Sequence, residues 1–166
     1  MSSLEAAETK DPWKLFHFFL GIWAGTGTGS SGTSSVRRSY ALTLANQFIE
    51  IRNRSEFPPQ ENNPSGEVHE DRRFISYDKM RSVYMLREFH VEGYVNQYAL
   101  EPFEPQSRMY VFLTKAIENI PDGWNARITL EIHNQEEFRE TFDLAAGAGR
   151  EWTCLIANEF HRVRGL

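Results

Sequence analysis

Cysteine is nearly absent from this sequence, with Cys154 alone among 166 residues. An internal disulfide is therefore excluded, and we expect a reducing compartment, the cytoplasm, because disulfides persist mainly in oxidising ones. Lysine and arginine never form a run longer than a pair, and the formal net charge is -5. Because proteins that follow a phosphate backbone need a basic surface, the sequence predicts no nucleic-acid partner.

Long apolar runs are also missing. The longest apolar cluster, residues 15–23, is interrupted by His17 and Gly21 and falls far short of the roughly 20 residues that cross a bilayer. Residues 1–10 have neither the cationic start nor the apolar stretch of a signal peptide. We therefore expect no membrane span and no export signal, with residues 1–10 as a disordered arm before a single domain at 11–166.

Helical periodicity is confined to one short segment near the N-terminus. Asp11 followed by Pro12 is typical of an N-cap with proline at the first helical position. Trp13, Phe16, His17 and Leu20 then fall on one helical stripe, which ends at Gly21. The pattern predicts a short helix over 12–20 and no long helix after it.

Aromatic residues, by contrast, are plentiful at 13% of the chain, and they suit the pleated surface of a sheet. Alternating segments separated by turn residues predict ten strands, at 23–34, 35–45, 47–57, 67–77, 81–91, 94–101, 108–118, 126–133, 137–144 and 151–163. Short sequential turns favour antiparallel neighbours, and a long meander removes its exposed edges by closing on itself. The predicted fold is all-β, a closed antiparallel up-and-down barrel of eight to ten strands with a short N-terminal capping helix.

Three motifs carry a family resemblance. They are Phe-Leu-Gly-Ile-Trp-Ala-Gly at 19–25 directly after the helix, Ile-Ser-Tyr-Asp at 75–78 before a turn, and Trp152 with Asn-Glu-Phe-His-Arg at 158–162. Together they resemble a bacterial family of uncharacterised lipocalin-like (calycin) domains and, more distantly, the nitrobindin and fatty-acid-binding barrels. The resemblance spans most of residues 12–164.

The resemblance implies a structural contact and a haem alternative. In calycins an arginine of the last strand packs over the Gly-x-Trp indole, which implies Arg162 or Arg164 over Trp23 as barrel closure. Nitrobindin-like barrels bind haem through a histidine on the last strand, where this sequence has Glu159, with His161 two residues along the same face. Haem binding through His161 therefore stands as an alternative, and no other metal ligand is predicted.

Strand parity supplies candidate residues for a ligand site. Tyr94, Asn96 and Tyr98 share one face and would give directional hydrogen bonds, although an outer aromatic stripe explains them equally well. Apolar lining is expected from three further residues with inward parity, Phe112, Leu130 and Phe142.

Charged side chains with inward parity would be more informative. Glu140 shares the parity of Phe138 and Phe142, so it is expected to meet a cation or a ligand hydroxyl, or to lie at the barrel mouth. An interior arginine would pair with a ligand carboxylate, as in fatty-acid-binding barrels, and the candidates by parity are Arg52, Arg54 and Arg87. Exposure is the commoner outcome for arginine.

Two other patterns carry little weight. The Gly-x-Gly-x-x-Gly at 27–32 precedes a β-branched, hydroxyl-rich segment instead of the helix that a dinucleotide site needs, so a curved strand is favoured. The histidines lie in five different elements without metal-ligand spacing, at His17, His69, His90, His133 and His161.

The preferred functional hypothesis is non-catalytic binding of a small hydrophobic or amphipathic ligand inside the barrel. Haem binding is one alternative. An isomerase or lyase on the same scaffold is another, with Glu140 and either His90 or His161 as the acid–base pair. A solidly packed barrel that acts as an interaction surface, for instance as a homodimer, is the last. No catalytic residue is predicted.

Overall fold

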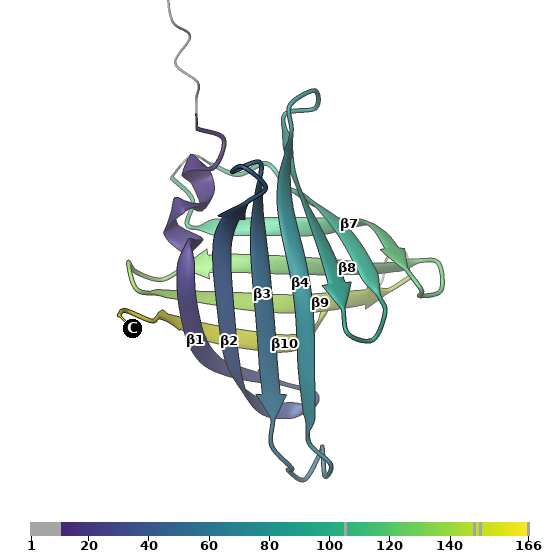
Figure 1. Ribbon diagram of the computed structural model, residues 1–166. Helices are drawn as coiled ribbons and strands as arrows, with labels where there is room; N and C mark the ends of the chain where they lie inside the picture. Colours follow the sequence, from purple (N-terminus) through teal and green to yellow (C-terminus); the bar gives the residue numbers. More distant parts are fainter. Residues whose placement is uncertain (1–10, 105, 148, 150, 166) are drawn as a thin grey trace, which may run out of the picture.

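The fold is a closed barrel of ten antiparallel strands, which confirms the predicted fold class (Figure 1). The computed structural model describes residues 11–104, 106–147, 149 and 151–165, so the expected arm at 1–10 lies outside the described residues. The strands are β1 (Gly21–Gly29), β2 (Gly32–Thr43), β3 (Phe48–Phe57), β4 (Glu67–Asp78), β5 (Val83–His90), β6 (Val95–Leu100), β7 (Met109–Glu118), β8 (Trp124–Ile132), β9 (Glu137–Ala146) and β10 (Thr153–Arg162). Each strand pairs with its sequence neighbours, and β1 pairs with β10 to close the barrel. Within the described residues, no helix is long and apolar enough to cross a membrane.

The N-terminal helix is shorter and tighter than the pattern predicted. It is a 3-10 helix, η1 (Lys14–Phe19), and the Asp11 carboxylate accepts a hydrogen bond from the Trp13 amide at 2.9 Å. Phe16 and Phe19 of this segment, and Trp13 just before it, all reach the core, because side chains three residues apart eclipse in a 3-10 helix. His17 is exposed and contacts Asp11, so its expected place on the buried stripe is wrong.

The glycine-rich segment is a β-hairpin and not one strand over 23–34. The turn at 30–31 joins β1 to β2, and Gly32 has φ +99°, a conformation that favours glycine. Inside β1, a Cβ on Gly25 would lie 1.9 Å from the Glu159 carbonyl oxygen of β10. Glycine there permits the close approach of the first and last strands, and the motif is followed by a strand, not by a helix.

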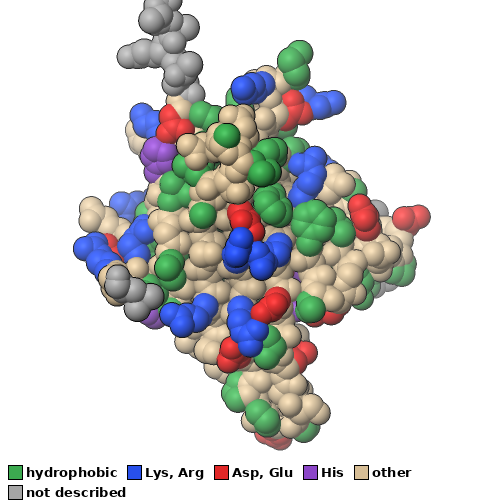
Figure 2. Space-filling view, viewed as in Figure 1, with side chains coloured by type: hydrophobic (Ala, Val, Ile, Leu, Met, Phe, Trp, Pro, Cys, Tyr) green, Lys and Arg blue, Asp and Glu red, His purple; other side chains and the backbone are tan. Residues whose placement is uncertain are grey.

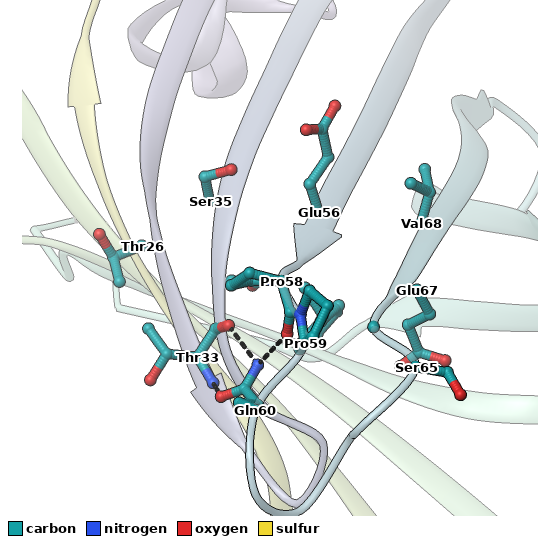
Figure 3. A pocket seen from close by; sticks show the side chains of 13 residues that line it. Thr26, Thr33, Ser35, Glu56, Pro58, Pro59, Gln60, Ser65, Glu67 and Val68 are labelled. Atoms are coloured by element: carbon teal, nitrogen blue, oxygen red, sulfur yellow. Dashed lines mark hydrogen bonds between the residues drawn. The ribbon is translucent and has the colours of Figure 1, made fainter.

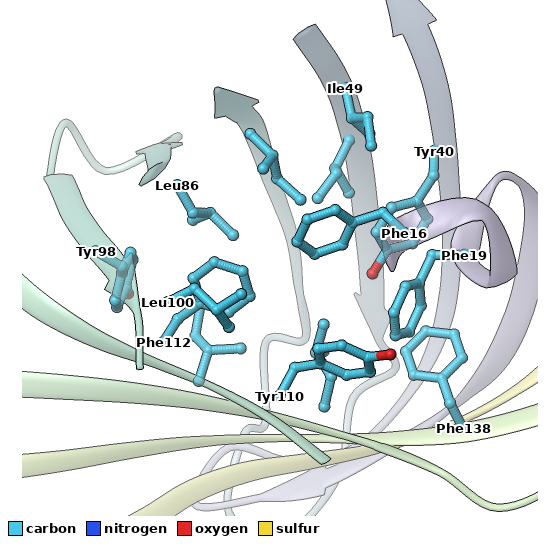
Figure 4. Close-up of a cluster of buried hydrophobic side chains, with 14 of the residues drawn as sticks. Phe16, Phe19, Tyr40, Ile49, Leu86, Tyr98, Leu100, Tyr110, Phe112 and Phe138 are labelled. Carbon is cyan, nitrogen blue, oxygen red and sulfur yellow. The ribbon is translucent and has the colours of Figure 1, made fainter. Parts of the chain in front are cut away.

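An aromatic core fills the barrel end next to η1 (Figure 4). Phe19 packs edge-on against Phe138 at a centroid distance of 5.2 Å, and Trp23 packs edge-on against the same ring at 4.8 Å. The Trp23 indole N–H donates to the Phe19 carbonyl at 2.7 Å. Helix η1 therefore plugs this end of the barrel with its own aromatic side chains.

A C-terminal arginine completes this plug. The guanidinium carbon of Arg162 lies 4.3 Å from the centroid of the Trp23 ring, and Arg162 also donates to the carbonyls of Phe18 and Leu20. Arg164, the other candidate for this position, is exposed and pairs with Glu136. The last strand thus holds the helix onto the barrel.

Candidate functional site

A buried polar network occupies the barrel interior beyond the aromatic core. Its side chains are polar or charged, face inward, and are at most 7% exposed. They are Arg38, Asn53, Asp71, Arg73, Glu88, Asn96, Tyr98 and Glu140, and we call this set the polar network. They come from β2 to β6 and from β9, so closure of the barrel is what brings them together.

Glu140 lies at the centre of the polar network. Arg38 reaches its two carboxylate oxygens with both terminal nitrogens at 2.5 and 2.8 Å, and Arg73 adds a contact at 2.8 Å. Burial raises the pKa of Glu140, but the charges and hydrogen bonds of the two arginines outweigh it and lower the pKa to about 2. The expectation that Glu140 meets a cation is confirmed, and the barrel-mouth alternative is wrong.

A second branch of the polar network runs from Arg73 toward β5 and β6. Arg73 Nε lies 3.0 Å from Asp71 and 2.7 Å from Glu88. The Tyr98 hydroxyl donates to Glu88 at 2.9 Å and accepts from the Asn96 amide at 2.8 Å. These contacts fix the orientation of every one of the five side chains.

The polar network carries unequal charges. The guanidinium groups of Arg38 and Arg73 face three carboxylates, those of Asp71, Glu88 and Glu140, which leaves one negative charge uncompensated. An unpaired buried charge is costly, so a cation is expected nearby. His90, at the end of β5, has Nε2 3.4 Å from Glu88. Burial lowers the pKa of His90, but the hydrogen bond and charge of Glu88 outweigh burial and raise it above its ordinary value.

Among the described residues, four buried side-chain atoms have no hydrogen-bond partner. One is Arg139 Nε, and the other three belong to buried residues: Ser34 Oγ, Asn96 Oδ1 and Asn158 Oδ1. Because the Asn96 amide nitrogen donates to Tyr98, its oxygen must be a free acceptor. Ser34 Oγ and Asn158 Oδ1 converge on Gly27, each 2.5 Å from the position of an added Cβ. A buried unsatisfied polar atom costs about 1–3 kcal/mol, so these atoms favour a bound donor at the polar end.

The predicted lining residues are divided between the two ends of the barrel. Asn96 and Tyr98 belong to the polar network, whereas Tyr94 is 41% exposed and lies apart from it. Phe112 and Leu130 are buried in the aromatic core. Phe142 is half-buried beside that core.

The proposed interior arginines face outward. Arg52 and Arg54 alternate with the buried residues Ile51, Asn53 and Ser55 of β3, and both are exposed. Arg52 pairs with Glu50 on the outer face of β2–β4, where several blue side chains lie close together in Figure 2. A hollow of about 260 Å³ lies beside these residues. The predicted parity is wrong: Phe48 shares the parity of the two arginines, but Ile49 and Ile51 mark the inner face of β3.

The parity prediction fails for Arg87 in the same way. It is exposed and donates to Ser76, while its neighbours Leu86 and Glu88 face the interior. The interior arginines that sequence reasoning missed are Arg38 and Arg73. Arg38 shares parity with Val36 and Tyr40, which was a usable signal, whereas Arg73 lies among charged residues at 67–73 that give no apolar parity.

The residue on which the haem alternative depends faces away from the barrel. His161 and Glu159 are exposed on β10, because Asn158 and Phe160 of this strand face inward. His161 therefore cannot approach a ligand in the interior, and it cannot form an acid–base pair with Glu140.

The other proposed acid–base pair does reach the interior. His90 approaches the polar network through Glu88, but Glu140 is held by two arginines at the network centre. With its pKa lowered to about 2, Glu140 is a fixed anion at neutral pH and cannot serve as a general acid.

An open groove of about 710 Å³ lies at the tip of β1–β4, beside the loop at 58–66 (Figure 3). A row of outward side chains, Thr26, Ser35, Glu56 and Val68, forms part of it, each opposite the next across the sheet. Gln60 fixes the loop by hydrogen bonds to both backbone groups of Thr33, at 2.8 and 3.0 Å. The groove is lined mainly by hydroxyl, proline and loop residues, so we place the candidate site at the polar network instead.

Comparison with known proteins supports the fold alone. No protein-family model matches the sequence, and no curated protein matches it. The structure is similar to the crystal structure of Rv2717c from M. tuberculosis, with a TM-score of 0.64 over 92% of this chain and 98% of that chain. Because the two sequences are only 14% identical, the likeness shows a shared barrel fold and does not extend to function.

Proposed function

We propose that this protein binds a small amphipathic molecule, without a covalent step, at the barrel end opposite η1. The observation that carries the proposal is a difference between two walls of the barrel. The β4–β6 wall holds the polar side chains of Glu88, Asn96 and Tyr98. The β7–β9 wall supplies partly buried apolar side chains, Ile117, Phe142 and Leu144.

The polar head of this ligand is expected to donate hydrogen bonds. Asn96 Oδ1 is a buried acceptor with no partner in the part of the chain that is described, and the polar network has an excess of one carboxylate. A carboxylate head would meet repulsion from Glu88 and would find Arg38 and Arg73 already paired with Glu140. An amine or alcohol head fits this environment better than an acid.

A wholly hydrophobic ligand fits less well. The apolar half of the interior is filled by the protein's own aromatic rings, among them Phe16, Phe19 and Phe138. A ligand there would have to displace η1, since Phe16 and Phe19 belong to it. We therefore expect an amphipathic ligand at the junction of the two walls, where polar and apolar side chains meet.

Calorimetric titration with three chain-matched probes tests the proposal. Dodecylamine, dodecanol and dodecanoate are titrated below their micellar concentrations, in buffer containing EDTA. We expect dodecylamine to bind one equivalent most tightly and dodecanoate most weakly. Asn96→Ala should weaken dodecylamine about tenfold, because it removes one hydrogen bond worth about 1–1.5 kcal/mol.

The matched control is Asn125→Ala, which removes an exposed asparagine of β8 and should leave the affinity unchanged. Failure of all three probes to bind would refute the proposal. So would dodecylamine affinity that is the same in Asn96→Ala as in the wild-type protein.

A further inference from the structure

Three side chains with metal-ligating atoms meet at the rim of the barrel end opposite η1, which we call the mouth. His69 lies near the start of β4, His90 ends β5, and Glu92 follows in the turn before β6. One ligand atom from each lies within 4.8 Å of the other two. His69 and His90 are 21 residues apart in the sequence. The antiparallel pairing of β4 with β5, in which Asp71 lies opposite His90, brings them side by side.

The spacing suits a small ion after minor adjustment. Zinc bonds of about 2.0–2.2 Å to nitrogen and oxygen place tetrahedral ligand atoms about 3.4 Å apart. His69 Nδ1 and Glu92 Oε1 are now 2.7 Å apart, as a direct hydrogen bond. Glu92 is exposed and belongs to a turn, so its carboxylate can swing outward to admit an ion between the two groups.

The second nitrogen of each ring faces a carboxylate of the polar network. His69 Nε2 lies 3.8 Å from Asp71, and His90 Nε2 lies 3.4 Å from Glu88. Metal-binding histidines usually donate their other ring N–H to a carboxylate, which orients the ring and increases its basicity. With each Nε2 on the side of a buried carboxylate, Nδ1 of each ring is the atom left for a metal.

The charges match a divalent ion. Two arginines face three carboxylates in the polar network, which leaves one negative charge, and Glu92 at the mouth contributes a second. A doubly charged cation between His69, His90 and Glu92 would neutralise both. The alternative is a protonated His90 beside Glu88 with His69 paired to Glu92, and this alternative requires no metal.

We propose that His69, His90 and Glu92 form a binding site for a divalent transition-metal ion such as Zn²⁺ or Co²⁺. Two imidazoles and one carboxylate are ligands that Zn²⁺ accepts, and the remaining coordination positions face the barrel mouth. The inference goes beyond the proposed ligand binding and does not depend on it, because it uses different residues and the probe titrations contain EDTA.

Cobalt spectroscopy on the metal-free protein tests this site. Protein stripped with EDTA and then freed of chelator is titrated with Co²⁺, followed by Zn²⁺. We expect the visible absorption bands of low-coordinate Co²⁺ to saturate at one equivalent and to disappear when Zn²⁺ displaces it. His69→Gln, His90→Gln and Glu92→Gln should each weaken Co²⁺ binding about tenfold or more.

The control variant is His161→Gln, which removes an exposed histidine of β10 and should bind Co²⁺ as the wild-type protein does. If His90→Gln does not fold by circular dichroism, His69→Gln and Glu92→Gln decide, since both side chains lie at the mouth. Wild-type protein that binds less than one equivalent, or binding unaffected by these two variants, would overturn the proposal.

Discussion

Replacement of Glu140 by glutamine should be the most destabilising conservative change in the polar network. The substitution keeps the shape of the side chain but removes the charge that Arg38 and Arg73 share. Both arginines are buried, so each would retain a positive charge with too few partners. Removing one member of a buried ion pair costs about 3–5 kcal/mol, and we expect Glu140→Gln to fall in this range.

The size of this effect should depend on pH in a defined direction. The pKa of Glu140 falls from an ordinary 4.5 to about 2 in the folded protein, so its contribution is fully present above pH 5. It is lost as the pH falls toward the folded pKa, because the protonated side chain then resembles glutamine. From this shift, the stability difference between wild type and Glu140→Gln should narrow by about 2 kcal/mol between pH 6 and pH 3.

Urea denaturation followed by tryptophan fluorescence at several pH values measures both quantities. Glu136→Gln is the matched control, because Glu136 forms an exposed pair with Arg164 and should change the midpoint little. If the difference in unfolding free energy between wild type and Glu140→Gln stays constant between pH 6 and pH 3, the reasoning is refuted. A loss of stability below about 1 kcal/mol at neutral pH would also refute it, because exposed salt bridges contribute no more than about that amount.

Two further predictions concern the closed end of the barrel. Arg162→Ala should destabilise the protein by about 2 kcal/mol in thermal denaturation, because it removes the contact with Trp23 and two hydrogen bonds to the residues around the end of η1. Arg164→Ala is the control and should have little effect. Gly25→Ala should lower the free energy of unfolding by about 3 kcal/mol or more in urea denaturation, because its Cβ would collide with the Glu159 carbonyl. Thr28→Ala, at an exposed position of the same strand, is the control and should be as stable as wild type. If Gly25→Ala is as stable as wild type, β1 and β10 can move apart without loss of stability, and the prediction is wrong.

Much of the barrel could be predicted from local patterns. The loop at 58–66 was apparent from its prolines and glycine, and the strands after it were placed within a few residues of their observed ends. The first hairpin was misplaced because Gly, Ser and Thr occupy both faces of 23–34 and leave no apolar alternation. The helix was predicted in the right place, but its 3-10 form depends on the packing of Phe16 and Phe19 in the barrel end.

The candidate site was predictable only in part. Glu140 could be placed inside because Phe138 and Phe142 fix the parity of β9, and its need for a cation followed from burial alone. Arg73 could not, because β4 alternates charged residues on both faces before Ile75. Which of several arginines compensates a buried carboxylate depends on which strands meet across the barrel, and this information is not local.

The pairing of Trp23 with Arg162 joins positions close to the two ends of the described chain, and this has a consequence for how the protein folds. Nine hairpin connections can form between neighbouring segments as they leave the ribosome, but the seam between β1 and β10 can form only after the last strand has been synthesised. Until then, β1 and the growing end both present unpaired backbone edges, which attract other strands. The seam should therefore be a late and slow step in folding, and a chain that ends before residue 153 should aggregate instead of folding into a smaller barrel.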